Sequence, residues 1–425
     1  MDTLPLELKQ RVCSYLTPND LKSLRLTSKA LVSAACRDFL PRIFLHNHPG
    51  SFEEIQDITN HPDLKHSVTT MVVDTSCLSS CPRYDDWIRF FIPTPTYRAE
   101  LQSLEMPAGI SDARTVRRLR REKVCEKWKA YQNRASGQRK KFSKDCMFNS
   151  IALAFQLCPR LKNLIIEGRY HNSPELSRRR IRLYQNDLPS PDTHTAVHYL
   201  STWDPMTFDI WELLKPIHEV GRTLESLVLL DLGLVCSEGS TLPTTPIFTN
   251  LKHLRENGCP ENFLTFILTS APALESFGTE DGFGYRWGSS MLSLINAPPL
   301  PKLRACSLRN PSNEDLLIRF LLRHSSTLQR LRIYNSRTYH SPVDWTSFFT
   351  RVKGKLSNLR RVELINLETG PRTYNTMARS VVSIVADEKD ILQDHEHELE
   401  TGPMAIYDGL WEDYETTFFP QHGMW

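Results

Sequence analysis

A short phrase recurs along the chain and constrains its fold more than any other feature. It consists of a leucine after a turn residue, an apolar residue three positions on and often another two positions later. The second and third apolar residues share one face of an extended strand, and the residue between them faces the other way. Each copy therefore predicts a strand. Clear copies begin at Leu161, Leu224, Leu251, Leu274, Leu303, Leu328 and Leu359, and weaker ones at Val68 and Leu101.

The spacing of the copies indicates a repeat. From Leu224 onward they are 27, 23, 29, 25 and 31 residues apart. Helical patterns lie between them, in the segments ENFLTFILTSAP, NEDLLIRFLLRHS, DWTSFFTRVKGKL and NTMARSVVSIVAD. A strand and a helix in each unit predict a mixed α/β fold, an irregular solenoid of parallel strands and helices that resembles the leucine-rich repeats.

One position departs from that resemblance. Leucine-rich repeats usually carry Asn or Cys three residues after the third apolar position, where it bonds backbone groups of adjacent coils. Only Cys259 fits, so an unrelated α/β domain whose buried strands begin with leucine stays open as the alternative. The other copies place Arg169, Leu232, Gly282, Pro311, Ser336 and Leu367 there.

The first 40 residues predict three short helices. Pro5 suits the first turn of a helix, where its missing N–H costs nothing. Thr17 and Asp20 make a capping-box-like start for the second helix, with Asp in place of Glu or Gln, and Thr27 or Ser28 can cap the third. Three such helices carry more apolar surface than so small a unit can hide, so the rest of the chain or a partner must cover it.

Residues 4–39 resemble an F-box, in the Leu-Pro start, the leucine-rich YLTPNDL segment and the ending LRLTSKAL. The following passage, from PRIFLHN to VTTMVVD, is similar to fungal F-box proteins. The resemblance implies docking on the Skp adaptor of cullin–RING ubiquitin ligases. The residues that would contact the adaptor or hold the helices together are Leu4, Pro5, Leu8, Val12, Leu16, Leu21, Leu24, Leu26 and Leu31.

The chain of 425 residues is too long for one core, since single cores stop growing at roughly 250–300 residues. We expect an F-box over 1–45, the repeat region over 46–386 and an acidic tail over 387–425. Two insertions interrupt the repeat: a basic, helical one at 107–145 and a polar loop at 169–207.

Two blocks of opposite charge stand out. Residues 114–144 hold thirteen Lys or Arg and two Glu, and residues 387–415 hold eleven Asp or Glu and one Lys. The basic block is open to three interpretations: a solvated helix, a nuclear localisation element, or a contact to nucleic acid or an acidic client. Trp128 and Tyr131 lie within it and could stack on bases. The opposite charges suggest the hypothesis that the tail folds back on the basic insertion.

A client would bind the outward residues of the strands, because solenoids bind through their concave surface. Many of these residues are basic, which favours an acidic or phosphorylated client. The basic candidates are Lys252, His253, Arg304, Arg330, Arg332 and Arg361.

Motifs of catalysis and cofactor binding are missing from the sequence. It has no P-loop, G-x-G-x-x-G, H-E-x-x-H or G-x-S-x-G segment. Cys77 and Cys81 with His46 and His48 lack the second half of a zinc motif. We therefore expect no catalytic residue, metal or cofactor.

The chain shows neither a signal peptide nor an apolar run of the ~18 residues that span a bilayer, which favours the cytoplasm, the nucleus or both. The leading interpretation is a substrate receptor of a ubiquitin ligase. The alternatives are an F-box scaffold outside a ligase and a nuclear protein that binds nucleic acid through residues 114–144.

Overall fold

The computed structural model describes most of the repeat region and part of the N-terminus. The described residues are 5–13, 15–16, 18–27, 31–32, 34–35, 40–75, separate positions between 121 and 137, 141–167, 179, 209–230, 246–257, 259–279, 289–309, 311, 313–334, 343, 345–369 and 380–387.

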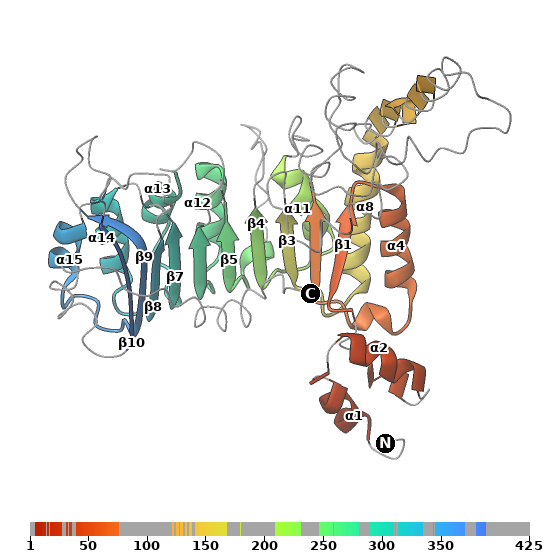
Figure 1. Ribbon diagram of the computed structural model, residues 1–425, viewed down its shortest axis with the longest axis horizontal. Helices are drawn as coiled ribbons and strands as arrows, with labels where there is room; N and C mark the ends of the chain where they lie inside the picture. Colours follow the sequence, from red (N-terminus) through yellow and green to blue (C-terminus); the bar gives the residue numbers. More distant parts are fainter. Residues whose placement is uncertain are drawn as a thin grey trace, which may run out of the picture.

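One ten-stranded sheet runs the length of the molecule, with its strands in chain order from β1 to β10 (Figure 1). Strands β1 to β9 pair in parallel, each with the next, and β10 pairs antiparallel with β9. The strands are β1 (Arg42–His46), β2 (Thr70–Asp74), β3 (Asn163–Glu167), β4 (Ser226–Leu230), β5 (His253–Glu256), β6 (Ser276–Thr279), β7 (Ala305–Arg309), β8 (Arg330–Tyr334), β9 (Arg361–Thr369) and β10 (Ser380–Asp387).

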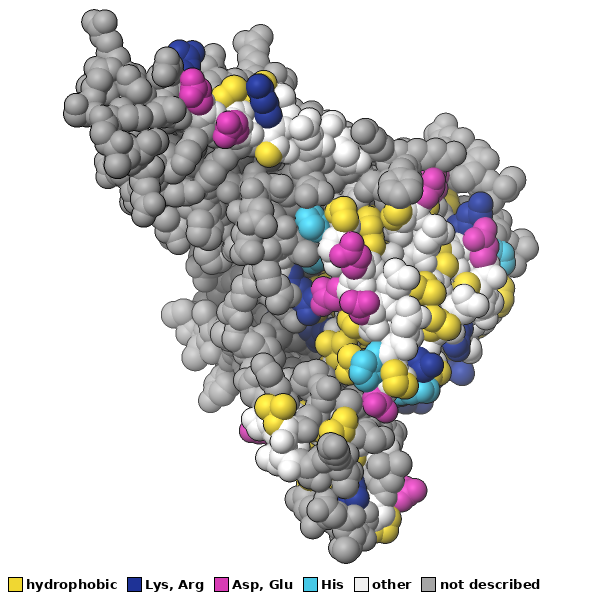
Figure 2. All heavy atoms as spheres, turned by 90° about the vertical axis from the view of Figure 1, so that its right-hand side faces the viewer, with side chains coloured by type: hydrophobic (Ala, Val, Ile, Leu, Met, Phe, Trp, Pro, Cys, Tyr) yellow, Lys and Arg dark blue, Asp and Glu magenta, His cyan; other side chains and the backbone are white. Residues whose placement is uncertain are grey.

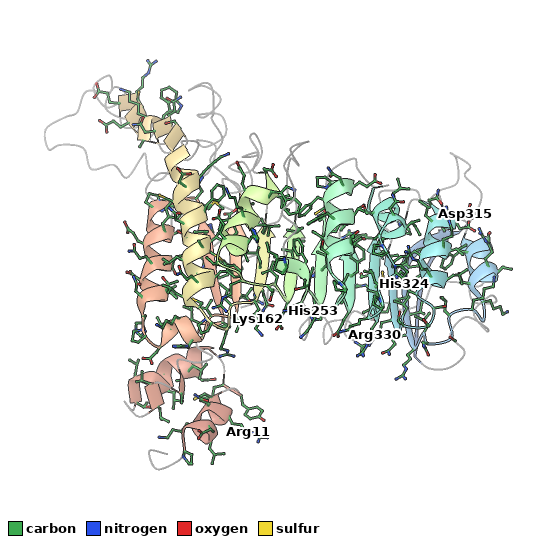
Figure 3. All side chains as sticks on the ribbon, turned by 180° about the vertical axis from the view of Figure 1, so that it is seen from behind. Arg11, Lys162, His253, Asp315, His324 and Arg330 are labelled. Atoms are coloured by element: carbon green, nitrogen blue, oxygen red, sulfur yellow. The ribbon has the colours of Figure 1, made fainter. Side chains whose placement is uncertain are left out.

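Helices pack side by side along one face of this sheet (Figures 1 and 3). None of the helices in the described part of the chain is long and apolar enough to cross a membrane. The helices of this row are α4 (Pro49–Asn60), α8 (Lys141–Leu157), α11 (Ile210–Glu219), α12 (Glu261–Ser270), α13 (Ser289–Asn296), α14 (Glu314–Arg323) and α15 (Trp345–Val352), with short 3-10 turns η1 (Leu64–His66) and η2 (Pro246–Phe248).

The recurring phrase forms the core between sheet and helices. Its first leucine is buried in all six copies from Leu161 to Leu328, and the second apolar residue, such as Leu164 or Leu227, joins the same hydrophobic cluster. The weaker copy at Val68 leads into β2, and the copy at Leu101 lies outside the described residues. The phrase therefore marks the strands of the sheet, as predicted.

Backbone hydrogen bonds join each unit to the one before it at the point where the strand starts. The N–H groups of Glu225 and Ser226 both donate to the carbonyl of Lys162, at 2.9 and 3.4 Å. The same pair of bonds recurs at each later start, ending with Arg360 and Arg361 on the carbonyl of Gln329. We call this row of carbonyls the strand-start ladder.

At Cys259, the one copy that fits the expected asparagine or cysteine position, a backbone bond is made within the same unit. Cys259 is buried, and its N–H donates to Glu256 Oε2 at 3.0 Å. Both residues belong to one unit, so this bond closes the turn between β5 and α12.

Three of the four predicted helical segments are confirmed as α12, α14 and α15. The fourth prediction, for NTMARSVVSIVAD, is wrong, because residues 380–387 form β10 on the edge of β9. This segment carries Val381, Val382, Ile384 and Val385, and β-branched side chains favour a strand. The free edge of the last parallel strand supplies the partner, which local periodicity does not show.

The N-terminal helices α1 (Leu6–Cys13) and α2 (Pro18–Thr27) have a small core of their own. Cys13, Leu21, Ala34 and Ala35 are buried in it. Residues 31–32 and 34–35 are helical, and the rest of the predicted third helix lies outside the described residues. The unit projects from the β1 end, on the side where the strands begin (Figure 1).

The sequence-predicted insertions and tail fall largely outside the described residues. Of 107–145, the structure describes separate positions from 121 to 137 and residues 141–145 at the start of α8. Of 169–207 only Arg179 is described, and of 387–425 only Asp387. The predicted fold-back of the tail on the insertion stays a hypothesis.

His324 ties α14 to the segment that leads into β7. Its Nε2 accepts from the Leu300 N–H at 3.1 Å, so the proton is on Nδ1, which donates to the Phe320 carbonyl at 2.9 Å. The side chain is 2% exposed. Burial, with Arg323 nearby, lowers the pKa of His324 from its ordinary 6.5. The ring is therefore neutral at physiological pH.

We expect His324→Leu to lower the free energy of unfolding by about 1–3 kcal/mol, because the buried Leu300 N–H loses its acceptor. The wild-type protein should also lose stability as pH falls below 6.5, since the unfolded chain then binds a proton that the folded chain does not. Urea unfolding at about pH 7.5 and about pH 5.5 measures both effects. The exposed His66→Leu is the control, and equal losses in the two variants would contradict the assignment.

Candidate functional site

Exposed large hydrophobic side chains are concentrated in the N-terminal unit, on α1, on α2 and in the turn between them. Leu8, Tyr15 and Leu26 are 49, 78 and 83% exposed. Leu292 on α13, at 40%, is the only other large hydrophobic residue with comparable exposure among the described residues. Seen end-on, the N-terminal unit forms the narrow lower part of the molecule with hydrophobic side chains on its surface (Figure 2). Such a concentration makes this unit the candidate surface for a protein partner.

The structure separates the adaptor-contact candidates by burial. Pro5, Leu8 and Leu26 are exposed, and Leu21 and Leu31 are buried. Contact and core roles could not be told apart in the sequence, because both demand leucine at helical spacing. Half-buried positions are Val12, Leu16 and Leu24, and Leu4 lies outside the described residues.

Side chains that precede the strands form a second surface along the strand-start ladder. They alternate in charge from β3 to β7, as Lys162, Glu225, Lys252, Glu275 and Arg304. Neighbouring parallel strands lie about 4.8 Å apart, so successive side chains in this row can pair. Lys162 and His253 lie along this edge with Arg330 (Figure 3).

One client candidate, Lys252, forms an ion pair within this row of side chains. Lys162 Nζ lies 2.6 Å from Glu225 Oε1, and Lys252 Nζ lies 3.6 Å from Oε2 of the same carboxylate. The hydrogen bond from Lys162 lowers the pKa of Glu225, with Lys252 contributing less. Lys252 therefore already has a partner within the protein.

Three further candidates also differ from their sequence-based interpretation as free cations. Burial lowers the pKa of His253 to about 4, so this side chain is neutral at physiological pH. Arg361 Nη2 donates to Glu363 Oε1 at 2.7 Å, and Arg332 Nε lies 3.6 Å from Oε2 of the same buried carboxylate. Arg304 is exposed, and Arg330 is half-buried beside Arg361 in the register.

The face of the sheet away from the helices changes character along its length. Over β1–β4 its central row is apolar and buried, with Phe44, Val72, Ile165 and Val228. The Arg179 guanidinium lies 4.2 Å from the centroid of the Phe44 ring. Over β5–β9 the same row reads Arg255, Gly278, Ser307, Arg332 and Glu363. The fifth residue of each phrase shows this change in the sequence, and sequence reasoning did not use it.

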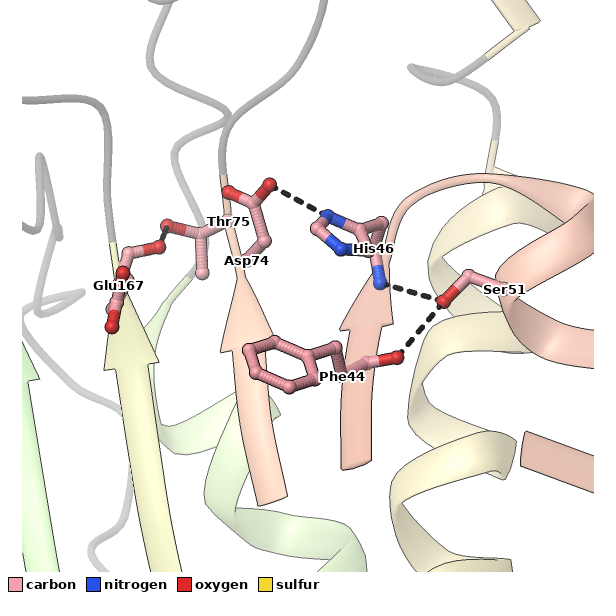
Figure 4. Close-up of polar contacts among 6 residues, drawn as sticks. All are labelled: Phe44, His46, Ser51, Asp74, Thr75 and Glu167. Carbon is pink, nitrogen blue, oxygen red and sulfur yellow. Dashed lines mark hydrogen bonds and ion pairs between the residues drawn. The ribbon is translucent and has the colours of Figure 1, made fainter. Parts of the chain in front are cut away.

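Polar side chains meet where β1, β2 and β3 end (Figure 4). His46 Nδ1 is 2.9 Å from Asp74 Oδ2, and both side chains are buried. The Ser51 hydroxyl accepts from the His46 backbone N–H and donates to the Phe44 carbonyl. Because Ser51 contacts backbone and not the imidazole, serine and histidine do not form a nucleophile–base pair. The group ties the start of α4 to the end of β1.

The zinc alternative gains no support from the described residues. His48 Nδ1 accepts from the Gly50 N–H at the start of α4, and His46 pairs with Asp74. Cys77 and Cys81 lie outside the described residues. The described part of the chain contains no group of three His, Cys, Asp or Glu side chains arranged to hold a metal ion.

Comparison with protein families bears on the first of these surfaces. Residues 1–45 match the family model of the F-box-like domain. No curated protein matches the chain. The protein thus carries an F-box-like domain, and the exposed large hydrophobic side chains of the described residues, apart from Leu292, lie within that match. F-box domains generally bind Skp-type adaptors.

We expect Asp74→Ala to lower the free energy of unfolding by about 1–3 kcal/mol, because the buried His46 Nδ1 loses its partner. Asp74→Asn keeps an oxygen acceptor and should lose less. Both variants should bind an adaptor as the wild type does, since the N-terminal unit has a separate core. Chemical denaturation and a binding titration on the same samples test this, and unchanged stability in Asp74→Ala would rule out a structural role for the pair.

Proposed function

We propose that the protein is the substrate-recognition subunit of an SCF-type cullin–RING ubiquitin ligase. The observation that carries the proposal is the F-box-like match over 1–45 together with the exposure of Leu8 and Leu26 within it. Binding to a Skp-type adaptor would remove this apolar surface from water, at roughly 25 cal/mol per Å² of apolar area. The segment 41–74, whose sequence is similar to fungal F-box proteins, supports a fungal type of F-box protein.

The repeat region would act as a leucine-rich-repeat-like solenoid that holds a protein client. Nine parallel strands in chain order and the strand-start ladder support this assignment, because each unit then contacts its neighbours only. The client would bind on the Arg-bearing half of the open face or on the edge where the strands start. The receptor itself would catalyse no reaction and would contribute proximity between the client and the ubiquitin carrier. It would act in the cytoplasm, the nucleus or both.

An F-box scaffold outside a ligase is the alternative. It would bind the adaptor equally well but would not join a cullin, and its deletion would leave the turnover of bound clients unchanged. Reconstitution with purified adaptor, cullin and RING subunits separates the two, because only a ligase subunit appears in the complete assembly.

We expect Leu8→Asp and Leu26→Asp each to weaken adaptor binding by at least about tenfold, since each places a charge in an apolar contact. Titration with the purified adaptor measures the effect. Leu292→Asp is the matched control, because it makes the same change at an exposed leucine on α13 and should bind normally. The buried Leu21→Asp should instead unfold the N-terminal unit.

Thermal unfolding of the same proteins decides how a loss of binding is interpreted. Leu8→Asp and Leu26→Asp should keep the wild-type transition. Normal adaptor binding by both variants, or no binding by the folded wild type, would overturn the proposed function.

A further inference from the structure

The far end of the strand-start edge carries an excess of cations over anions. Lys302, Arg304, Lys355 and Arg360 are exposed and lie in the segments that lead into β7 and β9. Their side chains make no hydrogen bond or ion pair with another described residue. We call these four residues, with Arg361 beside them, the distal cationic rim.

The acidic side chains that the structure describes in this region already pair with arginines. Glu314 and Asp315 begin α14 and pair with Arg351 at 3.1 and 2.7 Å. Glu363 pairs with Arg361. Residues 301–363 contain thirteen Lys or Arg against four Asp or Glu, a net charge of +9. By contrast, the side chains that precede β3–β5 pair Lys162 and Lys252 with Glu225.

The path of the chain brings an acidic segment to this rim. Strand β10 runs antiparallel to β9, and its last residue, Asp387, is the Cα partner of Arg361. The chain therefore leaves the sheet at the edge where the strands begin, next to Arg360. The following residues 388–415 hold ten Asp or Glu and one Lys, a net charge of −9, and lie outside the described residues.

The position at which the acidic segment leaves the sheet favours its contact with the distal cationic rim over a contact with the basic insertion. The insertion leads into α8, which precedes β3 and packs on α4 and α11. Strand β9 is six strands away from β3, roughly 30 Å at the usual spacing of about 4.8 Å. A short flexible connection gives an effective concentration on the order of millimolar, which falls as the span grows. We propose that the acidic segment 388–415 docks on the distal cationic rim of its own chain.

Docking would also cover two of the client candidates, Arg304 and Arg361. An acidic client would then have to displace the tail, which would make the tail a competitor for the client surface. This consequence rests on the proposed function, whereas the docking itself does not and can be tested without an adaptor or a client.

The test uses a labelled peptide of residues 388–415 and the chain ended after Asp387, which keeps β10. Fluorescence anisotropy at about 50 mM salt, where the Debye length is over 10 Å, should show binding that weakens as salt rises. Arg304→Glu with Arg360→Glu should weaken binding by at least about tenfold, because two attractive charges become repulsive. The full-length chain should also bind the peptide at least about tenfold more weakly, because its own tail competes.

The matched control reverses two exposed cations of the basic insertion, Arg121→Glu with Lys129→Glu. It should bind as the parent chain does. A loss confined to this variant would assign the tail to the insertion, and equal losses in both variants would indicate non-specific charge attraction. Either result, or no peptide binding at all, would overturn the proposal.

A second measurement covers the case in which the shortened chain does not fold. In the full-length chain, Arg304→Glu with Arg360→Glu should speed proteolysis of the tail severalfold, whereas Arg121→Glu with Lys129→Glu should not. Equal cleavage rates in the wild type and the rim variant would contradict docking. Adaptor binding by these proteins should be unchanged, so the outcome is separate from that of the F-box experiment.

Discussion

The rest of the structure depends on the pair of backbone N–H groups that donate to one carbonyl wherever a strand starts. These bonds fix the register between neighbouring units, and a shift of one residue would turn the leucines of the phrase to the other face. The first leucine of the phrase, which precedes the strand start, is buried in the six copies from Leu161 to Leu328. Backbone geometry and apolar burial thus select the same register, so the sheet keeps its order without a ladder of asparagine side chains.

A fixed register also decides where charge collects. Side chains that precede the strands are held in one row, so Glu225 can reach both Lys162 and Lys252. Exposed pairs of this kind contribute little to stability, typically about 0–1 kcal/mol. Their main effect is to cancel charge near the N-terminal unit. The uncancelled cations remain at the far end, where β10 returns the chain to the same edge.

The N-terminal unit depends on the sheet for position but not for its core. Cys13, Leu21, Ala34 and Ala35 pack among themselves, which leaves Leu8 and Leu26 on the surface. A unit of this size cannot hide all of its leucines. Because the unit is too small to bury every leucine, it is weak as an isolated fold. The leucines left on its surface are available to a partner. One end of the molecule therefore exposes large hydrophobic side chains, and the other carries an excess of cations.

The sequence by itself determined the strands β2 to β9, the helices α12, α14 and α15, and the F-box-like start, because periodicity and motif spacing are local. It could not determine β10, since the free edge of β9 exists only after the sheet has formed. Nor could it separate Leu8 from Leu21, or show that Glu363 engages Arg361 and Arg332. These outcomes depend on which residues meet through space, and only the tertiary structure decided them.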